Sequence, residues 1–391
     1  MLMNRIRSAV VVVLLIVVPS LAAAQGTSVT VPALDFSGLL FGNFGWRTDD
    51  AAKATTGGKA LSKFDLGRAY LNFRMAAGDH GSIRVTTDIF QQSPSAYYSG
   101  WTVRLKYGYY QHDFTKSFAG VQGLGAVGRI GMLHTVVVDH MEGFWPRYLS
   151  QTAAELNGFF SSADVGAASL LTFPRKHGEM YFTIVNGANY SSGETDRFKD
   201  FAGRLSLTPF ANDSGFLRTL TISPWYSKGW AASQFVLGGA GQVGAVSDGL
   251  QKDRRGILVG LKDRRLAGAA EFSQKVDQFE TGANSVANPR VVNDRTGNLL
   301  SGYALVRPLE WGNTKSRSPW GLIGRFDSFK ANKSLPSAAT NPQNSFIILG
   351  TFWDLNAKAT FALDYQEIKS DIGTTSLFPT KTLFLHWQAN F

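Results

Sequence analysis

Cysteine is absent from the 391 residues, and charged residues make up only 17% of them. The absence of cysteine excludes thiolate metal sites, cysteine nucleophiles and a lipid-modified N-terminal cysteine. Soluble domains carry about 25% charged residues, so this chain is poor in charge. A mean hydropathy of −0.07 nonetheless excludes a bundle of membrane-spanning helices. The hydrophobic content of 44% excludes a disordered chain.

Long hydrophobic runs are confined to the N-terminus. Arg5 and Arg7 precede an apolar run at residues 9–18, which is followed by a proline and then by three alanines. This order of basic, apolar and small residues is typical of a cleaved secretory signal peptide. We therefore predict a signal peptide over residues 1–24 and an exported mature chain over residues 25–391. The run is too short for a helical membrane anchor.

Helical periodicity is nearly absent after residue 30, and apolar and polar residues alternate instead. In residues 82–89, for example, Ile83, Val85 and Ile89 share one face. About ten residues form each such segment, and Gly-, Asn-, Asp-, Ser- and Pro-rich stretches separate the segments. Roughly sixteen segments of this kind predict an all-β fold, a transmembrane antiparallel β-barrel of about 16 strands in a Gram-negative-type outer membrane.

A water-soluble β-sandwich also alternates, but two features favour the barrel. The polar face carries full charges such as Arg84 and Arg104, which a water-filled lumen tolerates and a packed core does not. Aromatic residues stand near the ends of the apolar faces, where amphipathic rings suit the lipid–water interface. These residues are Trp46, Trp101, Tyr109, Trp230, Trp320, Trp353 and Trp387.

The C-terminus alternates up to its last residue. Leu383, Leu385, Trp387 and Phe391 share the apolar face of the final segment. This pattern resembles the signal that the barrel-assembly machinery reads in outer-membrane proteins. We therefore expect that machinery and the lipid of the outer membrane as partners.

Sixteen strands close into a cylinder too wide to be filled by side chains, which leaves an aqueous channel. A period of two places a set of basic residues on the lumen face, opposed on the same faces only by Asp88, Asp327 and Asp364. This excess predicts a mild preference for anions during passive diffusion of small solutes. The basic residues are Arg68, Arg74, Arg84, Arg104, Lys106, Arg129, Arg204, Lys262, Arg325 and Lys358.

Residues 134–160 break the alternation, and a connection of this length needs a functional or packing reason. We predict that the segment folds into the lumen and narrows it, with Phe144 and Trp145 holding it to the wall; an ordinary external loop is the alternative. The residues predicted to face the permeating solute are Asp139, Glu142, Arg147 and Glu155. External loops are predicted at residues 186–200, 233–253, 277–297 and 331–344.

Two stretches resemble the phosphate-selective porin O and P family. Residues 64–73, FDLGRAYLNF, are similar to an early strand of that family, and residues 129–133 followed by 144–149 resemble its strand leading into the constriction loop. The resemblance implies a sixteen-stranded homotrimer with an arginine-lined channel. Family members that select phosphate carry a lysine cluster at the constriction, whereas residues 134–160 contain three acids and no lysine.

The leading functional hypothesis is therefore a porin rather than an enzyme, with no catalytic residue, metal or cofactor and no nucleic-acid partner. An outer-membrane barrel enzyme of the protease or phospholipase type is the alternative from another class. The adjacent acid–histidine pair considered for it is Asp139 and His140, with no serine motif in support. An adhesion or binding barrel that acts through its large loops is a third reading.

Overall fold

The computed structural model describes residues 33–92, 100–118, 120–237, 239, 241–312, 317–333, 343–370 and 379–391. The predicted signal peptide, residues 1–24, lies outside these residues and remains a prediction. No helix among the described residues is long and apolar enough to cross a membrane.

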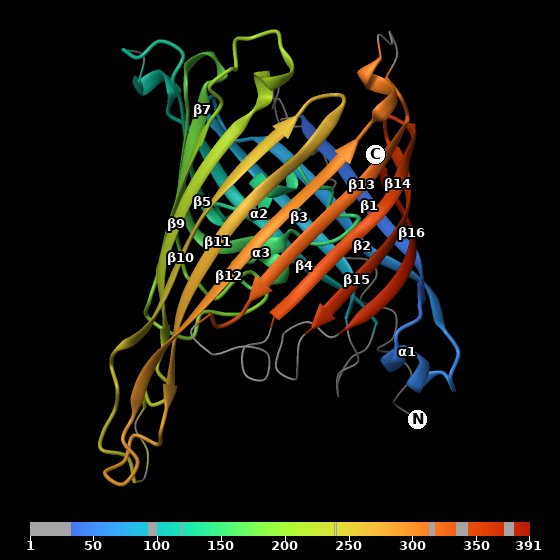
Figure 1. Cartoon of the computed structure of the whole chain (residues 1–391). Helices are drawn as coiled ribbons and strands as arrows, with labels where there is room; N and C mark the ends of the chain where they lie inside the picture. Colours follow the sequence, from blue (N-terminus) through green and yellow to red (C-terminus); the bar gives the residue numbers. More distant parts are fainter. Residues whose placement is uncertain are drawn as a thin grey trace, which may run out of the picture. The chain divides into compact units, whose positions relative to one another are not determined.

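Sixteen antiparallel strands form one closed barrel, in which each strand pairs with its neighbours in sequence and β1 pairs with β16 (Figure 1). The predicted fold class is thereby confirmed, including the strand number. The strands are β1 (Leu34–Arg47), β2 (Leu61–Ala76), β3 (Gly81–Gln92), β4 (Gly100–Asp113), β5 (Gly125–His134), β6 (Ala163–Thr172), β7 (Gly178–Val185), β8 (Asp200–Leu207), β9 (Thr221–Ala232), β10 (Gly249–Lys262), β11 (Leu266–Thr281), β12 (Val291–Val306), β13 (Trp320–Lys330), β14 (Gln343–Asn356), β15 (Ala359–Ser370) and β16 (Thr380–Asn390).

Helical structure in the described residues is limited to short pieces in the connections. The α-helices are α1 (Asp50–Thr55), α2 (Val138–Glu142) and α3 (Ala153–Leu156), and the 3₁₀ turns are η1 (Thr115–Phe118), η2 (Pro174–Lys176), η3 (Phe216–Thr219) and η4 (Pro308–Trp311). Both α2 and α3 lie in the long connection between β5 and β6, here called the inward loop (residues 135–162).

The two rims of the barrel differ in the length of their connections. The terminal rim holds Leu34 and Phe391, the two ends of the barrel chain, together with tight turns such as residues 263–265 and 357–358. The opposite rim, the loop rim, carries the longer hairpins, of which β11 and β12 extend furthest in Figure 1.

Two predicted external loops are shorter in the structure than expected. The pairing of β11 with β12 continues to Thr281 and Val291, so most of residues 277–297 belong to strands, and β10 already begins at Gly249. The prediction was wrong here because strands that project beyond the apolar belt carry polar residues on both faces, which in sequence resemble loops.

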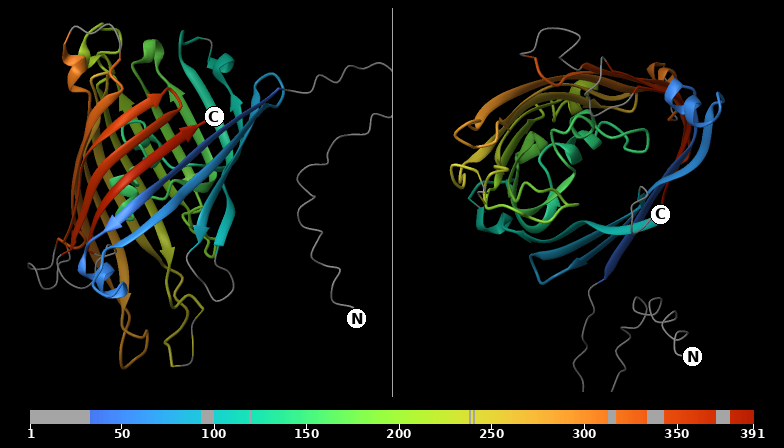
Figure 2. Two further views of the ribbon diagram at one scale, coloured as in Figure 1. Left: turned by 90° about the vertical axis from the view of Figure 1, so that its right-hand side faces the viewer. Right: turned by 90° about the horizontal axis from the view of Figure 1, so that it is seen from below.

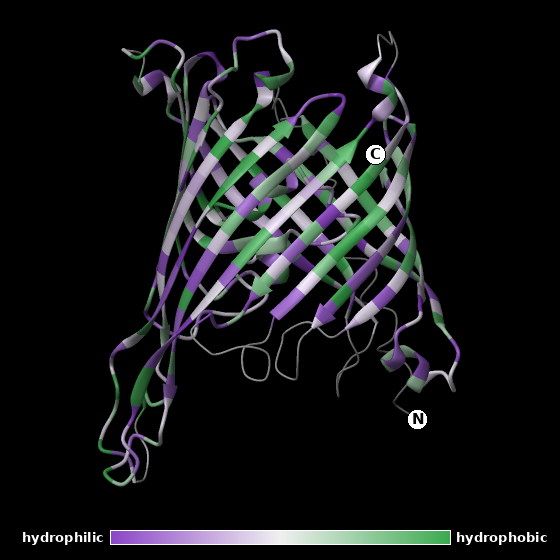
Figure 3. Cartoon of the chain, viewed as in Figure 1, coloured by the Kyte–Doolittle hydropathy of each residue, from purple (hydrophilic) through white to green (hydrophobic). Residues whose placement is uncertain are grey.

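The outer face of the barrel is apolar and is bounded by aromatic residues. Figure 3 shows apolar and polar residues alternating along the strands. Trp46 and Trp101 are exposed near the loop rim, whereas Trp353 is exposed near the terminal rim. Trp320 is the cross-strand partner of Trp353. Two aromatic belts at opposite ends are the arrangement expected for a barrel that meets two lipid–water interfaces.

A β-bulge in β4 changes which residues face the lumen. Thr86 pairs with Tyr107 and Thr87 pairs with Leu105, so Lys106 is the extra residue. A bulge shifts the alternation by one position, and Lys106 and Tyr107 are consequently both buried. We predicted Tyr109 among the outer aromatic residues; this was wrong, because beyond the bulge Tyr109 points inward.

The last strand closes the barrel by pairing with β1 from Thr382 to Asn390, and Phe391 adds one more pair of backbone hydrogen bonds at the terminal rim. The backbone amides of Gly38 and Phe391 each donate to the carbonyl of the other at 3.0 Å. The Phe391 ring covers Gly38, where any side chain would collide with it, and lies 5.8 Å from the Phe36 ring. Leu383, Leu385 and Phe391 are exposed on the outer face.

Candidate functional site: the inner wall and the inward loop

The inward loop lies inside the ring of strands (Figure 2, right). Its helix α3 begins at Thr152, whose hydroxyl accepts a hydrogen bond from the backbone amide of Glu155 at 3.3 Å. A Thr followed three residues later by Glu is a typical helix start. Asn157, which follows α3, donates to the carbonyl of Ala153 both from its side chain at 2.9 Å and from its backbone amide at 3.1 Å.

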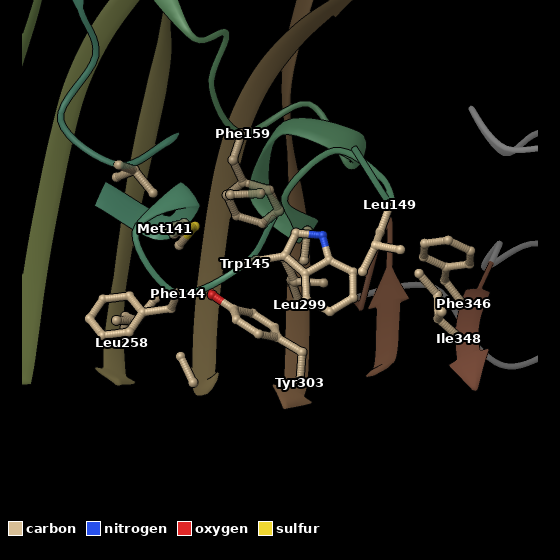
Figure 4. Close-up of a cluster of buried hydrophobic side chains, with 14 of the residues drawn as sticks. Met141, Phe144, Trp145, Leu149, Phe159, Leu258, Leu299, Tyr303, Phe346 and Ile348 are labelled. Atoms are coloured by element: carbon tan, nitrogen blue, oxygen red, sulfur yellow. The ribbon is translucent and has the colours of Figure 1, made fainter. Parts of the chain in front are cut away.

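Apolar side chains pack the inward loop against one half of the barrel wall (Figure 4). Trp145 is only 1% exposed, and its ring lies 5.3 Å from Tyr303 on β12. Phe159 is fully buried and lies 6.0 Å from Phe329 on β13. Burying a large apolar side chain contributes about 1.5–3 kcal/mol relative to exposing it, so these contacts fix the loop in place. Phe144 is also buried at the wall.

Basic side chains of the same half of the wall bind carbonyl oxygens of the inward loop. Arg325 donates to Gln151 at 2.7 Å, and Lys262 donates to Gly143 at 2.9 Å. Arg204 donates to the carbonyl of Val136. All three were predicted as pore-lining residues, and the structure places them on the inner face, where they hold the loop.

Sequence reasoning missed two further residues of this kind. Lys275 donates to the carbonyl of Asn157 at 2.9 Å, and Arg254 donates to the carbonyl of Phe159. Arg254 lies on the inward face of β10, four residues before Leu258. Following the period of two further back along β10 would have placed Arg254 on the lumen face.

The four charged residues predicted for the loop separate into a buried group and an exposed residue. Arg147 binds Glu155 at 2.7 Å and also Glu142. Burial alone would lower the pKa of Arg147, but these two carboxylates outweigh it and raise that pKa well above its usual value. Asp139 is 53% exposed and lies 3.5 Å from His134. Of the four, Asp139 is therefore the residue most open to a solute.

The other half of the wall, on β2 to β5, carries six of the predicted basic residues, which make no hydrogen bond to a loop carbonyl among the described residues. Arg84 donates to Asn72 and Thr86, at 3.1 Å each, and its Nη1 lies 3.2 Å from the His134 ring. The ammonium of Lys106 lies 4.3 Å from the centre of the Tyr70 ring. The six residues are Arg68, Arg74, Arg84, Arg104, Lys106 and Arg129.

Two predictions about the lumen charges need correction. Lys358 lies in the two-residue turn between β14 and β15 instead of on a strand, because β15 begins one residue later than the alternation suggested. More acids than expected share the inner face: Glu271 is buried there beside Ser273, and Glu179 binds Arg204. The positive excess is therefore concentrated on β2 to β5 and is smaller elsewhere.

Asp139 and His140, the pair considered for catalysis, lie on α2 rather than on a strand, and they contact different partners. His140 Nε2 lies 2.9 Å from the hydroxyl of Ser223. Ser223 is fully buried beneath the loop, so a substrate has no access to its oxygen. Among the described residues, no group of three or more His, Asp or Glu could hold a metal ion.

The chain matches no protein-family model, and no curated protein matches it. Solved structures match over nearly the whole chain. OmpF of Salmonella typhi, in a complex with daunomycin, has a TM-score of 0.61 at 11% identity over 92% of this chain and 97% of that one. The outer-membrane channel DcaP of Acinetobacter baumannii has a TM-score of 0.56 at 10% identity over 94% of this chain and 100% of that one.

An anion-selective porin from Comamonas acidovorans has a TM-score of 0.52 at 12% identity over 92% of this chain and 100% of that one. These similarities establish the fold: the chain forms a porin-type barrel.

Proposed function

We propose that this protein is an outer-membrane porin, a water-filled channel for passive diffusion of small solutes with a mild preference for anions. The observation that carries the proposal is the division of the inner wall. One half is covered by the inward loop, and the half on β2 to β5 carries six basic residues, of which all but the buried Lys106 are at least partly exposed. Cations lining a passage with low-dielectric walls raise the local concentration of anions.

The apolar outer face with its two aromatic belts supports a position in the outer membrane. The terminal rim then faces the periplasm, because short turns occupy that side of outer-membrane barrels and longer loops face outward. We also propose a homotrimer, which the resemblance to the porin O and P family implies. One of the similar structures, OmpT of Vibrio cholerae, is described in a trimer form.

We do not extend the proposal to phosphate selection. The inward loop has no lysine, and Glu142 and Glu155 are paired with Arg147, which leaves Asp139 as the exposed, acidic charge of the loop. An acid at that place repels a multiply charged anion more strongly than a singly charged one.

Conductance in planar bilayers tests the proposal. The purified barrel should give stable open steps, and a tenfold gradient of KCl should give a reversal potential on the anion side of zero. A heat-unfolded sample of the same preparation is the control. Purified, folded protein that inserts without open steps would contradict the channel, and a reversal potential on the cation side would contradict the anion preference.

Export and assembly form a separate part of the proposal, with the barrel-assembly machinery as partner. Deleting Phe391 removes the ring that covers Gly38 and the outermost of the backbone pairs that join β1 to β16. We expect folded protein in the outer membrane to fall and aggregates to appear in the periplasm. Phe391→Tyr, which retains the ring, is the matched control. Normal insertion of the shortened chain would contradict this part.

A further inference from the structure

A cluster outside the inward loop holds one guanidinium group against two aromatic rings. The Arg104 guanidinium carbon lies 4.1 Å from the centre of the Phe90 ring and 4.4 Å from the centre of the Tyr190 ring. Nη2 of Arg104 also donates to the Tyr190 hydroxyl at 2.7 Å. A guanidinium that is stacked and hydrogen-bonded in this way has lost most of its rotamer freedom.

The cluster keeps a net positive charge. Asp88 is 0% exposed, and one of its oxygens accepts from both Arg68 at 2.9 Å and Arg104 at 3.0 Å. Two guanidinium groups therefore share one carboxylate. Arg104 lies in the loop-rim half of β4, and Arg68 lies near the middle of β2.

Tyr190 reaches this place from the connection between β7 and β8, which we predicted to be an ordinary external loop. Asp164 holds the start of that connection by accepting from the backbone amides of Gly187 at 2.9 Å and Asn189 at 3.1 Å. Asn189 has a φ of 67°, which turns the chain inward. Tyr190 then packs beside Tyr107 and Tyr109.

We propose that Tyr190 is a positioning residue for ion selectivity: it fixes the Arg104 guanidinium beside the ion path, and Asp88 sets the net charge of the cluster. The inference rests on the proposed channel function and adds a selectivity site that is distinct from the inward loop. A fixed cation interacts with each passing anion from the same place, whereas a mobile side chain spreads its charge over many positions. Pre-organisation of this kind raises selectivity without adding charge.

The anion-to-cation permeability ratio, from the reversal potential in a KCl gradient, tests the inference. This ratio does not depend on how many channels insert, so poor folding of a variant does not imitate a change. Tyr190→Ala should lower the ratio roughly twofold, and Tyr190→Phe should lower it less, because the ring stays and the hydroxyl acceptor is lost. Asp88→Asn should raise the ratio, since it removes the one carboxylate. Ser192→Ala, an exposed residue of the same connection, is the control.

Arg104→Gln shows how much of the ratio the guanidinium itself supplies. An unchanged ratio in conducting Tyr190→Ala and Tyr190→Phe channels, beside a lowered ratio in Arg104→Gln, overturns the positioning role alone. If wild type, Arg104→Gln and Asp88→Asn all give the same anion-to-cation permeability ratio, the cluster does not determine selectivity and the inference is overturned. A wild-type barrel without open steps overturns the proposed function and this inference with it.

Discussion

Two aspartate-bound arginines, Arg325 and Arg104, occupy opposite situations on the inner wall. Arg325 binds Asp327 at 2.6 Å and uses its remaining donors on Ser150 and Gln151 of the inward loop, so its side chain has no exposed surface. Arg104 binds Asp88 but has no partner in the loop, and 23% of its side chain is exposed. The same residue type therefore anchors the inward loop on one half and remains partly exposed on the inner wall of the other.

The difference shows that the number of basic residues on the inner face does not measure the charge that an ion meets. On the covered half, loop carbonyls and wall acids bind the cations, and Arg204 and Arg325 are buried there. On β2 to β5, cations stack on tyrosine and phenylalanine rings, and two of them share the single carboxylate of Asp88. The four predictions below test this division, in order of decreasing expected effect.

Deleting residues 138–150 of the inward loop should raise single-channel conductance several-fold. The deletion removes α2 and the Trp145 anchor from the cross-section of the barrel, and pore cross-section governs conductance. Anion preference should persist, since the six basic residues of β2 to β5 remain. Removing residues 241–245 at the tip of a loop-rim hairpin is the matched control. A folded deletion variant with wild-type conductance would show that the loop does not limit the passage.

Arg325→Met should destabilise the barrel more than any single replacement on the uncovered half. It leaves Asp327 buried without its partner, and breaking a buried ion pair costs about 3–5 kcal/mol. Arg84→Met is the matched variant, because Arg84 is partly exposed and its hydrogen bonds go to neutral groups. Thermal unfolding of the detergent-solubilised barrel measures both. Equal losses of stability would remove the distinction between anchor and pore-facing cation.

Replacing Arg84, Arg104 and Lys106 together by glutamine should shift the reversal potential toward cations while the barrel still folds. Charges in water are screened over about 10 Å at 0.1 M salt and over about 30 Å at 0.01 M. The shift should therefore be largest in dilute salt. The corresponding triple replacement of Arg204, Lys262 and Arg325 should change selectivity less, since those cations are bound to the loop. An unchanged reversal potential at 0.01 M salt in the first variant would contradict anion preference.

Alternation with a period of two was sufficient to predict the barrel from the sequence, because each strand must present one face to lipid and the other to water. It failed where one residue changes the period. The bulge at Lys106 reversed the direction expected for Tyr107 and Tyr109. The start of β15 at Ala359 left Lys358 in a turn.

Partners of the inner-wall residues could not be predicted from the sequence. Lys262 and Arg104 have the same alternation pattern, yet one donates to Gly143 of the loop and the other stacks on Tyr190. Those contacts join residues more than eighty positions apart. These contacts depend on how two connections run through the lumen. The apolar–polar pattern of a single strand does not indicate that path.

The smallest expected effect concerns pH and the docking of the inward loop. Burial of His140, assisted by the charge of Arg204, lowers the pKa of its imidazole from 6.5 to about 3. The folded protein thus holds His140 neutral where the unfolded chain binds a proton, and linkage makes stability fall as pH drops from 6.5 toward 3. Protonation would place a charge against Phe144 and beside Arg204, and we expect the loop to loosen. His140→Gln has no such proton to bind and retains a polar group near Ser223. The unfolding temperature of wild type should therefore fall more between pH 7 and pH 4.5 than that of the variant, because both carry the same titrating carboxylates and differ only at this ring. Equal decreases would show that protonation of His140 does not destabilise the docked loop in this range.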